Sequence, residues 1–83
     1  MNPDDARRLL SRLLDDIAPD ADLATIGDAE PLQEALDLDS MDFLNLMAAL
    51  QEATGIDLPE RDYPALSTVR GFTAYVAQHA PGP

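Results

Sequence analysis

The sequence predicts an all-α protein: a small four-helix bundle with three main helices, one short helix, and a long loop between the first and second helices. Apolar residues recur at helical spacing in three segments, each segment starts at a capping residue, and no useful length of chain alternates as a strand does. We expect one domain over residues 1–83, with an ordered core of about 3–78 and a flexible tail at 80–83.

The first helix is predicted to begin after Asn2, which can cap it, with Pro3 at its first position. Asp4 and Asp5 then face the positive end of the helix dipole. Pro19 stops the helix. Its apolar stripe consists of Ala6, Leu9, Leu10, Leu13, Leu14 and Ile17.

The connection over residues 18–39 is long for so small a domain, and a loop of this length usually packs or has a role. A short helical turn is expected over residues 31–36. Four apolar side chains are expected to pin the loop to the core: Leu23, Ile26, Leu32 and Leu36.

The second helix is predicted to start at a cap, either Asp39 or Ser40, and to end before Gly55. It carries two apolar faces. One face holds Phe43, Leu46, Met47, Leu50 and Thr54, and the nearly opposite face holds Met41, Leu44 and Ala48, edged by Asp42, Asn45 and Glu52. A small bundle can bury only one face, so the second face is expected to be a contact site; the alternative is that neighbouring helices bury both.

The C-terminal part is expected to turn at residues 56–59 and to make one short helical turn from Glu60 to Tyr63, before Pro64. Ser67 or Thr68 then caps the last helix. Its apolar positions are Val69, Phe72, Tyr75 and Val76.

Charge restricts the possible partners of the chain. The formal net charge is −11, there is no lysine, and no basic residue lies between Arg12 and Arg61. This distribution repels nucleic acid and anionic lipid and favours proteins with basic docking surfaces, although acidity could serve solubility alone. The absence of cysteine, of a signal-peptide pattern and of a long apolar run leads us to expect a cytoplasmic monomer that does not insert into membranes.

The sequence offers no catalytic residue and no metal site. A nucleophilic serine needs a base, but the only histidine is His79, near the C-terminus, and the carboxylates beside Ser40 would oppose an oxyanion. The run at Asp20 begins like a calcium loop, but Gly27 and Pro31 stand at the wrong positions. We therefore expect a protein that is not an enzyme. An Asp-Ser pair before a helix is, by itself, most often a cap.

The chain resembles the acyl carrier protein family through Leu38-Asp39-Ser40-Met41-Asp42 at the start of the second helix. The resemblance continues through Leu46, Leu50, Gly55, Ile56-Asp57-Leu58-Pro59, Leu66, Ser67-Thr68-Val69 and Tyr75-Val76. It implies that a phosphopantetheinyl transferase attaches 4'-phosphopantetheine from coenzyme A to Ser40. The terminal thiol of this attached arm then carries acyl groups as thioesters. Asp39 would position the metal or basic groups of the transferase. Acyl-loading and acyl-processing enzymes of fatty acid, polyketide or related specialised biosynthesis would dock on Met41, Asp42, Leu44, Asn45, Ala48 and Glu52.

The chain departs from the family pattern at four positions. Met41 replaces the usual leucine, and Asp37 replaces a glycine but tolerates a left-handed backbone better than most residues. Asn45 and Gln51 stand where general fatty acid carriers are typically acidic, which suggests a dedicated pathway. Two other functions remain open: a free-standing peptidyl or aminoacyl carrier, and a non-catalytic helical adaptor in which Ser40 is only a cap.

Overall fold

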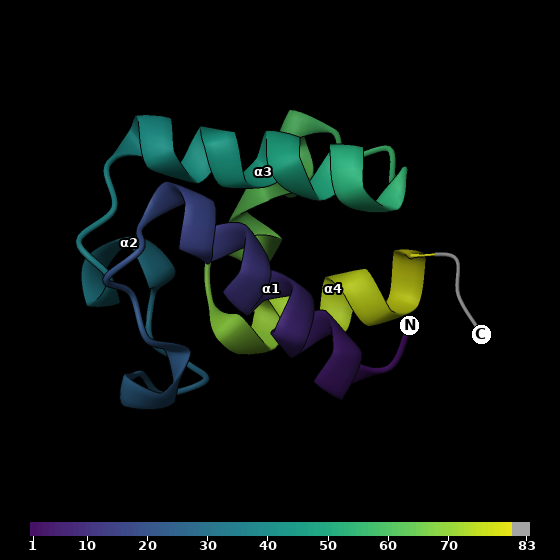
Figure 1. Cartoon of the computed structure of the whole chain (residues 1–83). Helices are drawn as coiled ribbons and strands as arrows, with labels where there is room; N and C mark the ends of the chain where they lie inside the picture. Colours follow the sequence, from purple (N-terminus) through teal and green to yellow (C-terminus); the bar gives the residue numbers. More distant parts are fainter. Residues whose placement is uncertain (81–83) are drawn as a thin grey trace.

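The computed structural model describes residues 1–80 as a helical bundle (Figure 1). Within these residues there is no β-strand, only an isolated bridge between Pro31 and Thr68. The all-α prediction is confirmed. The elements are α1 (Pro3–Ile17), the 3₁₀ helix η1 (Leu23–Thr25), α2 (Leu32–Ala35), α3 (Ser40–Thr54), the 3₁₀ helix η2 (Glu60–Leu66) and α4 (Val69–His79).

Helix α1 starts and stops where its sequence predicts. The side chain of Asn2 accepts a hydrogen bond from the Asp5 N–H at 2.8 Å, and Pro3 is the first helical residue. The helix ends at Ile17, two residues before Pro19. Its stripe is buried at Ala6, Leu9, Leu10 and Leu14 and half-buried at Leu13 and Ile17.

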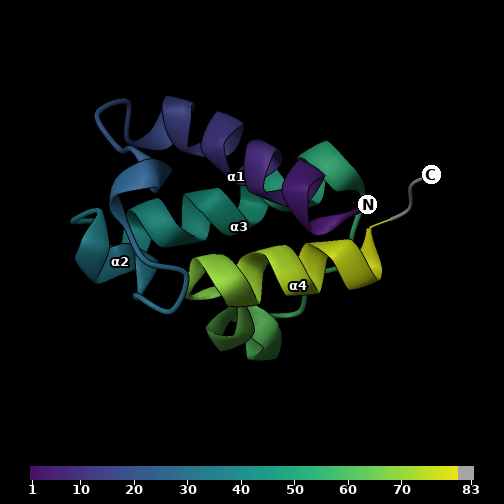
Figure 2. The same ribbon diagram turned by 90° about the horizontal axis from the view of Figure 1, so that it is seen from below.

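The three main helices enclose one apolar core. Helix α1 packs against both α3 and α4, and η2 packs against α4. Figure 1 shows α3 above α1 and α4, which lie against each other, and Figure 2 shows the same bundle from below, with α3 behind them. Within residues 1–80 every buried side chain is apolar.

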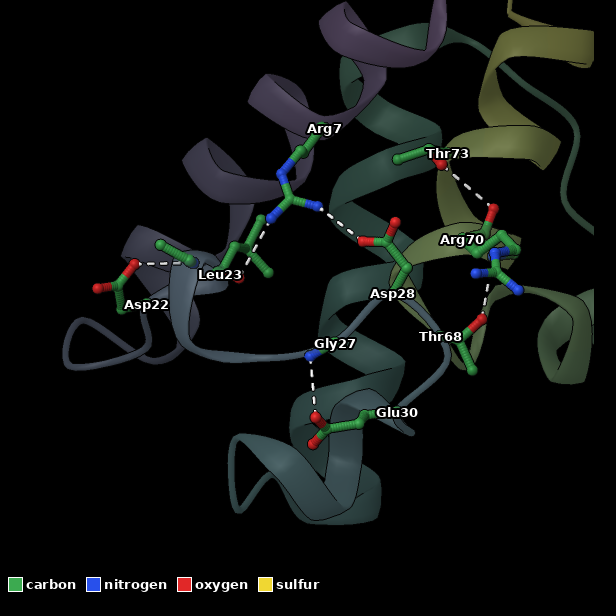
Figure 3. Close-up of polar contacts among 11 residues, drawn as sticks. Arg7, Asp22, Leu23, Gly27, Asp28, Glu30, Thr68, Arg70 and Thr73 are labelled. Atoms are coloured by element: carbon green, nitrogen blue, oxygen red, sulfur yellow. Dashed lines mark hydrogen bonds and ion pairs between the residues drawn. The ribbon is translucent and has the colours of Figure 1, made fainter.

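The long loop is pinned as expected and is also tied down by polar contacts (Figure 3). Leu23 and Leu32 are buried, while Ile26 and Leu36 are half-buried. The Arg7 guanidinium donates to Asp28 Oδ1 and to the Leu23 carbonyl oxygen, both at 3.2 Å. The Arg70 N–H donates to the Asp28 carbonyl oxygen at 2.9 Å, so the loop is held between α1 and α4.

Two expectations near the C-terminus need correction. η2 does not stop before Pro64 but continues to Leu66, because the fixed φ of proline suits a 3₁₀ helix. Ala80 was expected in the flexible tail but is buried, and its N–H donates to the Val76 carbonyl oxygen, because apolar contact with the core extends past α4. The rest of that tail, residues 81–83, lies outside the described residues.

Helix α4 is capped by Thr68, one of the two caps expected, whose Oγ1 accepts from the Gly71 N–H at 3.0 Å. A Cβ atom on Gly71 would overlap the carbonyl oxygen of Ala65. The glycine therefore lets the end of η2 lie directly against α4. None of the helices within residues 1–80 combines the length and the apolar character needed to cross a bilayer.

Candidate functional site

The N-terminus of α3 is capped by Asp39, not by Ser40. The Asp39 carboxylate accepts from the Asp42 N–H at 2.8 Å, and the Asp42 carboxylate accepts from the Asp39 N–H at 3.3 Å. This reciprocal pair is a capping box, here with aspartate in the place usually taken by glutamate or glutamine. Ser40 is the first helical residue, so the hypothesis of an adaptor in which Ser40 serves as the cap has lost its structural basis.

Ser40 presents a hydroxyl that the fold does not use. The residue is exposed, and its side chain makes no hydrogen bond within residues 1–80. The N–H groups of Ser40 and Met41 also find no acceptor in this part of the chain. Unpaired N–H groups at the positive end of a helix suit an anionic group such as a phosphate.

A left-handed residue, Asp37, leads the chain into this site. Asp37 has a φ of 55°, the one positive φ at a non-glycine residue within the described range, and it stands where the family pattern has glycine. Before it, the Leu36 N–H donates to the Leu32 carbonyl oxygen and closes α2. After it, Leu38 is buried and its N–H donates to the Gln33 carbonyl oxygen at 2.8 Å, which fixes where α3 begins.

The two faces of α3 differ as expected. Phe43, Leu46, Met47 and Leu50 are buried, and Thr54 is half-buried. On the opposite face Met41 and Leu44 are 68% and 47% exposed, and these are the large apolar side chains that residues 1–80 leave in water. Ala48, Asn45 and Glu52 are exposed beside them, while Asp42 is half-buried. The alternative in which both faces are buried is wrong.

The calcium-like run and the histidine considered as a base both make contacts within the fold. Asp22, in the calcium-like run, caps η1 by accepting from the Ala24 N–H at 2.9 Å. The ring of His79 stacks on Tyr75, with ring centroids 4.1 Å apart, at the C-terminal end of α4. Residues 1–80 contain no group of three or more His, Cys, Asp or Glu side chains placed to hold a metal ion.

Comparison with known proteins decides the family. Residues 5–76 match the family model described as the phosphopantetheine attachment site. The chain belongs to the acyl carrier protein family. It is 34% identical over 82 residues to a protein named acyl carrier protein from Streptomyces coelicolor, covering 95% of this chain and 89% of that protein. Over 47 residues it is 34% identical to an acyl carrier protein from Rubrobacter xylanophilus, covering 57% of this chain and 58% of that one.

Membership of the acyl carrier protein family identifies the chain as a carrier and not a catalyst, and phosphopantetheine as its prosthetic group. The structure fits such a group, because the start of α3 offers an exposed hydroxyl beside unpaired N–H groups.

Sequence reasoning missed three contacts that shape this carrier. The hydrogen bond between Tyr75 and Asp62 and the ion pair between Arg7 and Asp28 join residues 13 and 21 positions apart, and no local pattern signals them. The close approach at Gly71 did have a signal, because a glycine inside a predicted helix often marks tight packing.

Proposed function

We propose that Ser40 is the residue to which a phosphopantetheinyl transferase attaches 4'-phosphopantetheine. The observation that carries this proposal is the exposed hydroxyl at the first turn of α3, which the helix cap leaves unused. Once attached, the group supplies a thiol on which an acyl chain travels as a thioester. The chain itself contributes the anchoring hydroxyl and, beside it, N–H groups that suit the phosphodiester.

Asp39 supports the same reaction from the adjacent position. One of its carboxylate oxygens accepts from the Asp42 N–H, and the other has no partner within residues 1–80. Asp39 directly precedes Ser40 in the chain, so that second oxygen is suited to contact a metal ion or a basic group on the transferase.

The exposed face of α3 is the proposed docking surface for the transferase and for the enzymes that load and process the acyl group. Met41, Leu44 and Ala48 form its apolar centre, and Asp42, Asn45 and Glu52 its rim. Asp42 and Glu52 stand about 15 Å apart along the helix axis, with no charged residue between them. A complementary enzyme therefore has an apolar recess flanked by two separate basic groups. Such docking is steered by charge and short-lived, as a carrier that visits several enzymes requires.

The uncharged middle of this face also suggests which pathway the carrier serves. Asn45 is exposed, and Gln51 is half-buried. Both stand where a carrier of general fatty acid synthesis typically has acidic residues. We propose a dedicated polyketide or other specialised synthase as the user of this carrier.

Mass spectrometry tests the attachment site. Incubation with coenzyme A and a broad-specificity transferase is expected to add the mass of one phosphopantetheine to the wild type and to Ser11→Ala, but none to Ser40→Ala. Since Asp39 caps the helix, Ser40→Ala should change the free energy of unfolding by less than about 0.5 kcal/mol. An unmodified wild-type protein, under conditions that load a control carrier, would refute the assignment.

Kinetics of the same reaction test the docking face. Leu44→Glu should lower kcat/KM of the transferase, because it places a charge in the apolar centre. Ala53→Glu adds the same charge to an exposed position elsewhere on α3 and is the matched control. Equal kcat/KM values for the two variants would exclude docking through Leu44.

The carrier is also expected to shelter its cargo. Ligands that bind only the folded state raise its stability. If a long acyl chain enters a cleft between α3 and its neighbours, the long-chain form will melt at a higher temperature than the form with the bare arm. Equal melting temperatures would contradict this.

A further inference from the structure

The three methionines of the chain differ in their access to solvent. Met47 is enclosed in the core at 0% exposure, and Met1 is half-buried against that core. Met41 is 68% exposed, more than Leu44, the other large apolar side chain that residues 1–80 leave in water. An oxidant has to reach the sulfur atom of a methionine to react with it. Met41 is therefore the methionine most open to oxidation in the folded protein.

Oxidation of a methionine is a reversible reaction that needs only a peroxide. One oxygen atom passes to the thioether sulfur: the O–O bond breaks, an S–O bond forms, the sulfur gives up two electrons, and hydrogen peroxide is reduced to water. Thiol-dependent methionine sulfoxide reductases reverse the change, because they remove the oxygen as water while two thiols become a disulfide. The chain has no cysteine, so before an arm is attached no thiol of its own competes for the peroxide.

The position of Met41 determines what its oxidation would change. Met41 directly follows Ser40 in the first turn of α3, and with Leu44 and Ala48 it forms the apolar centre of the exposed face. A sulfoxide oxygen is a strong hydrogen-bond acceptor, and an apolar recess on a partner offers it no donor in place of water. Met41 takes no part in the core cluster, so the same oxygen leaves the packing of the bundle unchanged.

The residue at this position also differs from the family pattern, which has leucine where this chain has Met41. Leucine presents a similar apolar surface to a partner but has no sulfur atom. The substitution therefore keeps the apolar contact and adds a group that a peroxide can modify.

We propose that Met41 is a reversible oxidation site that controls docking: its sulfoxide weakens the binding of the phosphopantetheinyl transferase to the exposed face of α3. The oxidation site itself stands on the exposure of Met41, whereas its effect on docking rests on the proposed function. In the presence of peroxide an unloaded carrier then stays unloaded until a reductase restores the thioether.

Peptide mapping by mass spectrometry tests the oxidation site. After brief treatment of the unloaded protein with hydrogen peroxide, sulfoxide should form at Met41 roughly tenfold faster than at Met47, which is the control within the same molecule. In urea the two methionines should react at the same rate, because burial alone separates them. Equal rates in the folded protein, or an equally large difference in urea, would overturn the site.

Kinetics of the transferase test the effect on docking. After removal of the peroxide, the oxidised wild type should show a several-fold lower kcat/KM than the untreated protein, mainly through a higher KM, and a methionine sulfoxide reductase should restore it. Met41→Leu lacks the sulfur, and its treated form, compared with its own untreated form, should show no change. Complete oxidation of Met41 with no fall in kcat/KM, or the same fall in Met41→Leu, would overturn the effect.

Two further outcomes separate docking from folding and from attachment. The melting temperature of the oxidised protein should stay within about 4 °C of the untreated value. A larger fall would show that the oxidation acts through the fold and would overturn the docking effect. Failure to load the untreated wild type, under conditions that load a control carrier, would refute attachment at Ser40, and the peptide map would still decide whether Met41 is the oxidation site.

Discussion

Replacement of Gly71 by alanine tests how closely η2 lies on α4. In most helix interiors this change stabilises a protein by about 1 kcal/mol. Here the added Cβ would overlap the carbonyl oxygen of Ala65 and lie 3.1 Å from Thr68 Oγ1, the atom that caps α4. The stabilising effect of the alanine is therefore opposed by a clash and by disturbance of the cap.

The magnitude follows from the kind of atom that Cβ meets. Overpacking a core usually costs about 1–3 kcal/mol, and the upper value applies because a backbone carbonyl cannot rotate away as a side chain can. Subtracting the helix-propensity gain leaves a net destabilisation of about 2 kcal/mol. For a domain of this size that corresponds to a fall in Tm of roughly 8–16 °C.

Thermal unfolding followed by circular dichroism measures this fall. Gly27→Ala is the matched control, because its Cβ would meet only the flexible side chain of Glu30, at 3.1 Å. That variant should stay within about 0.5 kcal/mol of the wild type. If Gly71→Ala melts at or above the wild-type temperature, the close approach of η2 to α4 does not exist in solution.

Three further perturbations test other parts of the structure. Asp37→Ala should destabilise the protein by about 1 kcal/mol in urea unfolding, because alanine resists the left-handed backbone, whereas Asp37→Gly should not; equal losses would argue against that backbone. Because burial on folding and the hydrogen bond to Asp62 raise the pKa of Tyr75, its protonated hydroxyl contributes stability that is fully present below pH 10.0 and is lost as the pH rises through the raised pKa. In urea unfolding, Tyr75→Phe should therefore lose less stability at alkaline pH than the wild type does. Parallel pH dependences of the two proteins would contradict this. Arg7→Ala should speed hydrogen exchange over residues 22–30 and lower the free energy of unfolding by at most about 1 kcal/mol, since Arg7 and Asp28 are both partly exposed. Arg8→Ala breaks only the pair with Asp5 within α1 and should leave exchange in the loop unchanged.

The helices could be predicted because their limits are encoded locally. Asn2, Asp39 and Thr68 each accept a hydrogen bond from an N–H three residues ahead, and Gly55 takes the left-handed backbone at the end of α3 with a φ of 74°. These are interactions between near neighbours, so the order of residues is sufficient to indicate them. The division of α3 into a buried and an exposed face followed from periodicity in the same way.

The loops could not be predicted as well, because their conformation depends on distant residues. The position of Asp28 is set by Arg7 on α1 and by the N–H of Arg70 on α4, neither of which is near in sequence. The extent of η2 likewise depends on contacts with α3 and α4, made by Tyr63 and Asp62. For the site itself, the sequence left the cap open between Asp39 and Ser40, since both residue types cap helices well; only the geometry assigns it to Asp39.

The pairing of Asp39 with Asp42 leaves position 40 open to substitution and chemical labelling. Because the two aspartates secure the start of α3 without the neighbouring side chain, that side chain can be exchanged while the bundle stays intact. The chain has no cysteine, so Ser40→Cys would create a single thiol for maleimide chemistry. Fluorophores, spin labels or stable mimics of an acyl arm could then be installed at the native position without any transferase.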